Sequence, residues 1–281
     1  TRTLGTTAEN VKAAESRSAG AGVAGSGGSG GASGGAAGAA GASGGAAGSG
    51  GKSSGGAAGA TGGPVTVYIA GDSTVSTYAD TASSTDQAGW GQMIGARFDS
   101  RVTIQNRASG GQTARRFIDE NKLAPILSAI RAGDYLLVQF GTNDGNRTAM
   151  YTLNGQQIPY YLEPATDFKT YLQQYIDGVR SKGATPIFVT PPPRNSAYCT
   201  GGNSTGAHAQ AMRELGAAQN VAVSDLNAKT VEHLRAICPA PTPEDFFLLR
   251  WDGSVDGTHF QENGARILAG FVAEGLRDAA S

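Results

Sequence analysis

Three residues of this 281-residue chain have the types and spacing that nucleophilic catalysis needs: Ser73, Asp256 and His259. A serine hydroxyl is a weak nucleophile near neutral pH, so it requires an imidazole to take its proton and a carboxylate to orient that imidazole. Ser73 directly follows an apolar run, in Gly71-Asp72-Ser73-Thr74, and Asp256 precedes His259 by three residues. One tight turn can then bring the carboxylate to the ring nitrogen that faces away from the serine. The set predicts acyl transfer through a covalent serine ester.

Two further polar blocks each follow a strand-like run: Asn106-Arg107-Ala108-Ser109-Gly110-Gly111 and Gly141-Thr142-Asn143-Asp144. Because the carboxyl ends of parallel strands line one crevice, we expect both blocks to meet Ser73 at the same edge of a sheet. We expect the carboxylates of Asp72 and Asp144 to brace these loops by accepting hydrogen bonds from the backbone. The sequence therefore predicts one composite site assembled from four distant segments.

These four blocks, in this order, resemble those of the SGNH (GDSL-type) hydrolase superfamily, named for its Ser, Gly, Asn and His blocks. The resemblance extends over about residues 64–281. Within the superfamily the chain is most similar to the rhamnogalacturonan acetylesterases, on three further stretches: 89–92, 182–191 and 225–229. Pro192-Pro193-Arg194 departs from the family's pattern because it is richer in proline.

The resemblance implies a role for each residue. Ser73 attacks the ester carbonyl, His259 acts first as general base and then as general acid, and Asp256 orients its ring. The oxyanion is held by the backbone N–H groups of Ser73 and Gly111 and by the side-chain amide of Asn143. Losing one such donor costs roughly 3–4 kcal/mol of barrier stabilisation. The neighbouring Gly110 is an alternative to Gly111.

Substrate contacts are expected around the long irregular stretch from residue 145 to residue 163, because such loops in compact domains are commonly functional. Tyr151, Tyr160 and Tyr161, with Trp90, would form an aromatic wall for a sugar ring, or would merely cover the end of the sheet. Arg115, with Arg116 beside it, would meet an acidic sugar, or would begin a solvated helix. The predicted substrate-binding set is Trp90, Arg115 and Tyr151.

The cysteines and the remaining histidines bear on disulfides and metals. Cys199 and Cys238 would form a disulfide in an exported protein, or would remain two thiols. His208 and His233 lie in helix-like surroundings with polar neighbours and are expected to be solvated. Neither shows metal-ligand spacing, so the sequence predicts no metal and no cofactor.

Composition divides the chain into three parts. The formal net charge of -1 gives no reason to expect nucleic acid as a partner. Residues 1–19 lack a core pattern and are predicted to be a disordered N-terminal segment. Residues 20–63 are Gly, Ala or Ser apart from three positions and predict a flexible linker. Residues 64–281 form the predicted catalytic domain, without a stretch long enough to span a bilayer.

The domain alternates strand-like and helix-like segments. Short apolar runs typical of buried parallel strands occur at 65–70, 102–105, 135–140, 186–190 and 221–224. Apolar residues recur at helical spacing over 168–179 and 267–276. This order predicts an α/β fold, a three-layer αβα sandwich, and the resemblance implies a flavodoxin-like five-stranded parallel sheet.

Together these features predict a secreted or cell-surface serine esterase that removes acetyl groups from plant cell-wall polysaccharide. The substrate expectation, acetylated rhamnogalacturonan or pectin, rests on the resemblance alone. The protein is expected to be a monomer, tethered through the Gly-rich linker. The alternatives are a broad-specificity GDSL-type lipase or acylhydrolase and a non-catalytic carbohydrate-binding relative. The complete set of catalytic residues disfavours the second alternative, because a binding protein needs none of them.

Overall fold

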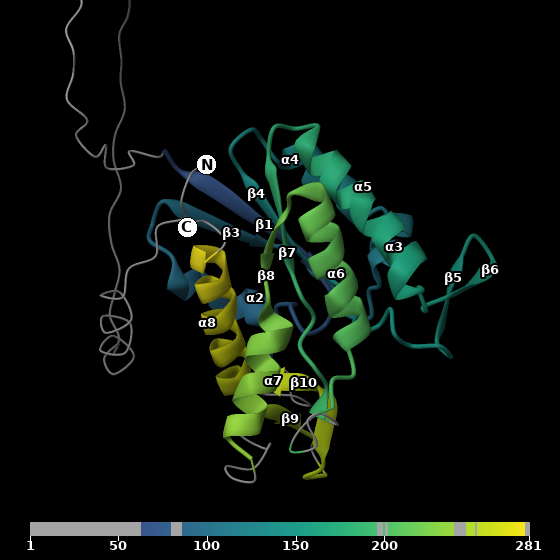
Figure 1. Ribbon diagram of the computed structural model, residues 1–281, viewed down its shortest axis with the longest axis vertical. Helices are drawn as coiled ribbons and strands as arrows, with labels where there is room; N and C mark the ends of the chain where they lie inside the picture. The colour runs from purple at the N-terminus through teal and green to yellow at the C-terminus, as the bar shows by residue number, and fades with distance from the viewer. Residues whose placement is uncertain are drawn as a thin grey trace, which may run out of the picture.

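The computed structural model describes residues 63–79, 86–195, 199, 202–238, 246–250 and 252–278 (Figure 1). The predicted N-terminal segment and, apart from residue 63, the predicted linker lie outside the described residues. The described part is an α/β fold whose helices cover both faces of one central sheet. Among the described residues no helix is long and apolar enough to cross a membrane.

The central sheet has five strands: β1 (Val65–Gly71), β3 (Val102–Asn106), β4 (Tyr135–Gln139), β7 (Thr185–Val189) and β8 (Ala222–Ser224). Their order is β3-β1-β4-β7-β8, and every neighbouring pair is parallel. Numbered along the chain, this is the 2-1-3-4-5 order of flavodoxin-like sheets. The predicted fold class is confirmed, with the predicted strand limits within two residues of the observed ones.

Alternation along the strands separates two hydrophobic cores, because successive strand side chains point to opposite faces. Tyr68 and Ala70 of β1 pack into one core, whereas Val67 and Ile69 pack into the other. The first core is covered by four helices: α3 (Ala114–Asp119), α4 (Leu123–Ala129), α5 (Lys169–Arg180) and α6 (Gly206–Gln219). The second is covered by three, which are α2 (Trp90–Met93), α7 (Leu226–Ala236) and α8 (Glu262–Asp278) (Figure 1).

The two predicted helical stripes are buried as expected. In α5, Leu172, Tyr175, Ile176 and Val179 are fully buried, and Gly183 follows the helix with a φ of +70° that favours glycine. A single π-helical turn, Pro164–Phe168, precedes α5, and a 3₁₀ turn, Ile94–Arg97, follows α2. In α8 the buried apolar stripe runs from Ala265 to Leu276.

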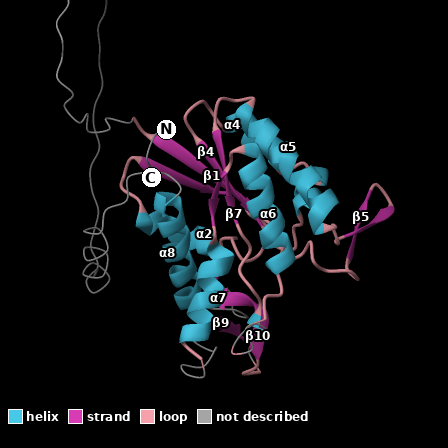
Figure 2. Cartoon of the chain, in the orientation of Figure 1, coloured by secondary structure: helices cyan, strands magenta, loops and turns pink. Residues whose placement is uncertain are grey.

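The stretch predicted to be irregular contains a hairpin, β5 (Met150–Leu153) and β6 (Gln156–Pro159), which projects from the remainder of the fold (Figure 2). Its turn is Asn154-Gly155, whose φ angles of 49° and 81° are those that a two-residue hairpin needs. The expectation of a wholly non-periodic loop is therefore corrected.

A second small sheet lies near the C-terminal helix. It pairs β10 (Val255–Gln261) with β2 (Gln87–Ala88) on one side and β9 (Phe247–Leu249) on the other, both antiparallel. The register between β10 and β9 shifts between Val255 and Phe260. Asp256 and His259 lie within this irregular part.

Cys199 and Cys238 form a disulfide across a sequence separation of 39 residues. The bond closes a loop that contains α6, β8 and α7. Of the two possibilities that the sequence leaves open, the structure has the bridge.

Candidate active site

Ser73 lies at the carboxyl end of β1, where the strand turns sharply. Asp72 holds the turn: its Oδ1 accepts from the backbone N–H and the hydroxyl of Thr74, at 2.8 and 2.7 Å. Gly71 is required here because a Cβ on it would lie 2.7 Å from a methyl carbon of Val75. The serine is buried, with 8% of its surface exposed, as are its neighbours Asp72 and Thr74.

The structure brings Ser73, His259 and Asp256 together in one hydrogen-bonded series. His259 Nε2 lies 3.0 Å from Ser73 Oγ, and His259 Nδ1 lies 3.1 Å from Asp256 Oδ1. The same carboxylate oxygen accepts the backbone N–H groups of Thr258 at 2.7 Å and of His259 at 2.8 Å. With Nδ1 donating to the carboxylate, Nε2 is free to accept the serine proton.

The environment of Asp256 keeps it ionised. Burial opposes its charge, but the backbone N–H groups of His259 and Thr258, together with the imidazole, hold the pKa of Asp256 below its ordinary value. Its second oxygen contacts Arg250 Nη2 at 3.3 Å. A carboxylate fixed from several sides is suited to orienting an imidazole and to stabilising the imidazolium that forms during acyl transfer.

The structure shows different local contacts for each of the predicted oxyanion donors. Asn143 Nδ2 donates to the carbonyl of Gln112 at 2.9 Å, which fixes its amide and leaves a second N–H of the same group. A Cβ built on Gly110 would lie 4.0 Å from the Cβ of Ser73. Gly111 has a φ of +70°, so glycine is favoured there. Both glycines therefore remain candidates for the backbone donor.

Two buried carboxylates brace the loops around the site, as expected. Asp144 Oδ1 accepts the N–H of Ala114 and its Oδ2 accepts the N–H of Gly141, each at 2.8 Å. Both Asp144 and Asp72 are fully buried. Burial, aided by the nearby charge of Asp72, raises the pKa of Asp144 to about 7. Burial also raises the pKa of Asp72.

The expected role of Trp90 in a sugar-binding wall is wrong, because its side chain is fully buried. The indole Nε1 donates to Gln139 Oε1 at 2.6 Å, and Gln139 Nε2 donates to the hydroxyl of Thr74 at 2.8 Å. Since Thr74 in turn donates to Asp72, Trp90 supports the turn that presents the serine. A fully buried ring offers no face to a sugar.

Tyr151 and Arg115 also make contacts within the protein. Tyr151 is 5% exposed and its hydroxyl donates to Asp119, which corrects its expected place in the wall. Arg115 donates to the carbonyl of Pro159 and lies 5.8 Å over the ring of Tyr171. The hydrogen bonds from Tyr151 to Asp119 and from Arg115 to Pro159 join the β5–β6 hairpin to α3.

Among the predicted aromatic residues, Tyr160 comes closest to Gly111. A Cβ on Gly111 would lie 3.6 Å from the Tyr160 hydroxyl and 3.4 Å from Arg116 Nη1. Arg116 donates to that hydroxyl and to the carbonyl of Gly111, and it pairs with Glu120 at 2.6 Å. The sequence named Arg116 only as a companion of Arg115, since nothing local distinguishes the two.

The expectation of solvated helix positions is wrong for His208. Its side chain is 4% exposed, its Nε2 lies 3.1 Å from the carbonyl oxygen of Leu162, and it packs edge-on against Phe168. Burial lowers its pKa. His233 is half-buried beside Phe246. Within the described ranges, no group of His, Cys, Asp or Glu side chains has an arrangement that could hold a metal ion.

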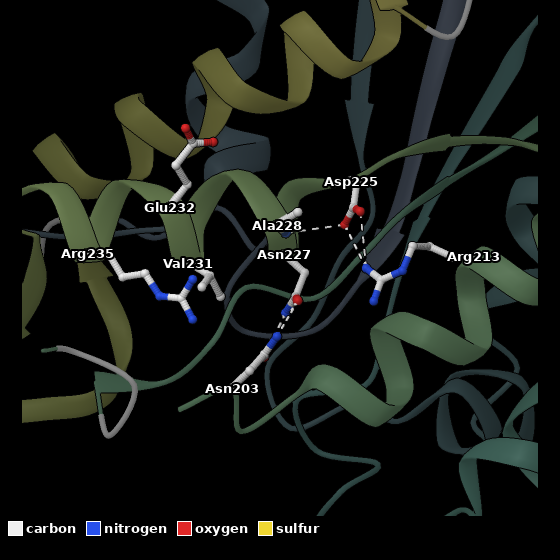
Figure 3. Close-up of a pocket in the computed structure, with 8 residues that line it drawn as sticks. All are labelled: Asn203, Arg213, Asp225, Asn227, Ala228, Val231, Glu232 and Arg235. Atoms are coloured by element: carbon white, nitrogen blue, oxygen red, sulfur yellow. Dashed lines mark hydrogen bonds and ion pairs between the residues drawn. The ribbon is translucent and has the colours of Figure 1, made fainter. Parts of the chain in front are cut away.

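A separate hollow of about 380 Å³ lies between α7, α6 and the segment before α6 (Figure 3). Its polar lining groups bond chiefly to one another. Arg213 Nη1 donates to both oxygens of Asp225 at 3.0 and 3.1 Å, and Asn203 Nδ2 donates to Asn227 Oδ1 at 2.6 Å. None of the triad residues lines it. These bonds hold the neighbouring segments together and use donors that a ligand would otherwise need.

Comparison with known proteins adds independent findings. The profile of the GDSL-like lipase/acylhydrolase family matches residues 69–267. The chain is 36% identical over 216 residues to the probable rhamnogalacturonan acetylesterase YesY of Bacillus subtilis, covering 75% of this chain and 92% of that protein. It is also 36% identical over 224 residues to the rhamnogalacturonan acetylesterase RhgT of the same species, covering 76% and 90%. The crystal structure of YxiM from Bacillus subtilis matches with a TM-score of 0.64 at 31% identity, over 77% of this chain and 57% of YxiM.

Proposed function

The chain belongs to the GDSL-like lipase/acylhydrolase family and is a carboxylic ester hydrolase; from that premise we propose that it removes acetyl groups from plant cell-wall polysaccharide. Acetylated rhamnogalacturonan or another pectin is the proposed substrate, because the two relatives at 36% identity are named rhamnogalacturonan acetylesterases. The observation that carries the catalytic part is the hydrogen-bonded series Asp256–His259–Ser73 at the carboxyl end of the sheet.

The proposed reaction has two halves. As Ser73 Oγ bonds to the acetyl carbon, its proton moves to His259 Nε2, and the oxyanion accepts hydrogen bonds from Asn143 and the glycine segment. The tetrahedral intermediate then expels the sugar oxygen, which takes the proton from His259. Water attacks the acetyl-serine with its proton moving to the same nitrogen, and collapse returns a proton to Ser73 and releases acetate.

The proposed place of action is outside the cell or at its surface. Disulfides persist in oxidising environments, and the Cys199–Cys238 bond supports such a location. A polymeric substrate in the plant cell wall also has to be met outside the cell that degrades it. We further propose that the enzyme acts as a monomer and that residues 20–63 tether the catalytic domain.

Acetate release from acetylated pectin, xylan and mannan tests the substrate proposal. We expect release from pectin to exceed the other two, and Ser73→Ala to lose release from all of them by at least a thousandfold. Release from xylan but not from pectin would reject the substrate and keep the mechanism. A 4-nitrophenyl ester series from acetate to octanoate covers the lipase alternative, which requires higher kcat/KM for the longer acyl chains.

A further inference from the structure

Arg194, at the end of the proline-rich stretch that departs from the family's pattern, lies between the loops that carry His259 and Asn143. Its Nη1 donates to the hydroxyl of Thr258, and its Nη2 donates to the carbonyl of Thr142 at 3.0 Å. Each threonine is the immediate neighbour of one of the two site residues. The guanidinium therefore stands at the edge of the reacting centre.

The charge of Arg194 has no counter-ion in the part of the chain that the structure describes. The guanidinium donates to two neutral oxygens, whereas Arg213 and Arg250 are paired with the carboxylates of Asp225 and Asp256. The side chain is half-buried, and two of the five N–H donors of a guanidinium are used in these bonds. The remaining donors and the uncompensated charge suit a planar anion such as a carboxylate.

The segment that delivers Arg194 is rigid. Residues 191–193 are buried prolines, which have no N–H to satisfy and a fixed φ. The hydroxyl of Thr205 donates to the carbonyls of the first two prolines at 3.1 and 3.2 Å, and Asn227 Nδ2 donates to the first at 2.7 Å. The backbone N–H of Arg194 donates to Ser204 Oγ at 2.9 Å. The guanidinium is thus positioned before a substrate binds, which lowers the entropy cost of binding.

We propose that Arg194 determines substrate specificity by binding the carboxylate of a uronic acid unit on or next to the acetylated sugar. The inference rests on the proposed function and narrows it to polysaccharides that carry free carboxylates near the ester. The rival explanation is that Arg194 only ties the two loops together. If Arg194 only holds the loops together, its replacement should lower kcat/KM equally for every ester. If it binds a carboxylate, its replacement should lower kcat/KM more for charged substrates than for neutral ones.

The test compares acetylated polygalacturonate with free carboxylates against the same polymer after methyl esterification. The measured quantity is the ratio of kcat/KM for acetate release from the two, so any common loss through the loops cancels. We expect the unchanged enzyme to prefer the free acid, and Arg194→Gln to lower the ratio by about tenfold, as for one charge-assisted hydrogen bond. Arg194→Lys, which keeps the charge without the fork, should fall between them.

Arg180→Gln is the matched control. Arg180 also donates only to neutral oxygens, the carbonyls of Gln219 and Asn220 at 2.7 and 3.2 Å, but it ends α5 beside the amino-terminal edge of the sheet. Its variant should retain the full ratio. An Arg194→Gln enzyme with an unchanged ratio, or an unchanged enzyme with no preference for the free acid, overturns the inference.

Inhibition supplies a second measurement that needs no acetylated polymer. Unacetylated oligogalacturonate should compete with 4-nitrophenyl acetate in the unchanged enzyme, less strongly at high salt, and Arg194→Gln should raise its inhibition constant about tenfold. Equal inhibition of both enzymes contradicts the carboxylate contact. The proposed function has its own test: it is rejected if the enzyme hydrolyses 4-nitrophenyl acetate but releases acetate from no polymer. If, in addition, oligogalacturonate does not inhibit the unchanged enzyme, the Arg194 inference is rejected as well.

Discussion

At the scale of single residues, the geometry assigns Asp256 to the orientation of His259. Asp256→Asn keeps the size of the side chain but replaces a charged acceptor with an amide, which favours the wrong imidazole tautomer. We expect kcat for 4-nitrophenyl acetate to fall by about 10⁴-fold, as in serine triads of this kind. The contact between the carboxylate and Arg250 is also lost, so a thermal melt accompanies the kinetics. A loss below tenfold in a folded variant would remove Asp256 from the triad.

Asp144 makes stability depend on pH. Because burial raises its pKa to about 7, the folded chain holds a proton that the unfolded chain loses near pH 4. The folded state then binds more protons across that interval, so the free energy of unfolding falls as pH rises from about 4 to 7. Burial acts in the same direction on the pKa of Asp72.

Asp144→Asn should therefore flatten this decline. The variant is expected to be less stable at every pH, because an amide cannot accept from both Gly141 and Ala114, but its free energy of unfolding should fall less between pH 5 and 7 than that of the unchanged protein. Urea unfolding at several pH values measures the two slopes. Parallel slopes would mean that Asp144 is already ionised at pH 5 in the folded chain.

Residue types alone could locate the triad, but they could not distinguish side chains that face a substrate from side chains that stabilise the fold. Ser73, Asp256 and His259 stand in short local patterns that the sequence displays. The buried indole of Trp90 donates to Gln139, 49 positions away in the chain, and Arg194 donates to residues of two separate loops. A tryptophan reads the same whether it faces a sugar or a buried amide, so only the tertiary contacts decide its role.

At the scale of elements, the parallel strands and the two helical stripes followed from hydrophobic periodicity because burial on one or both faces imposes it. The β5–β6 hairpin was missed, although Asn154-Gly155 is a strong signal for a two-residue hairpin turn. The flanking residues are mostly exposed, so they show no apolar alternation. The irregular register of β10 could not be foreseen either, since it depends on pairing with β2 and β9.

The disulfide acts on an element-sized unit. Cys199–Cys238 closes a separation of 39 residues around α6, β8 and α7. Replacing both cysteines with serine should lower the free energy of unfolding by about 2–4 kcal/mol, since the unfolded chain regains loop entropy. Denaturant unfolding in the absence of reductant measures this loss, and adding reductant should destabilise the unchanged protein but not the variant. Equal stability of the two proteins would contradict a stabilising bridge.

At the scale of the whole molecule, the site and both cores, as far as the described residues show them, are built from the predicted catalytic domain. The two buried clusters take their members from residues 67–276, and the triad joins Ser73, which follows β1 of the central sheet, to His259 of β10 in the small sheet, 186 positions away in the chain. The predicted domain boundary between residues 63 and 64 thus predicts that the residues needed for folding start at residue 64. It is separate from the prediction that residues 20–63 are a flexible tether.

Deleting residues 1–62 tests that division. Because the buried clusters begin at Val67 and β1 begins at Val65, the shortened protein should fold, with a melting temperature within a few degrees of the full chain. Its kcat/KM for 4-nitrophenyl acetate should agree within about twofold, since Ser73 and its partners are all retained. The matched control removes residues 1–68, which takes away the start of β1 and part of both cores and should abolish folding. If the shorter deletion also abolishes folding, the N-terminal residues contribute to the core and the assignment of a linker is wrong.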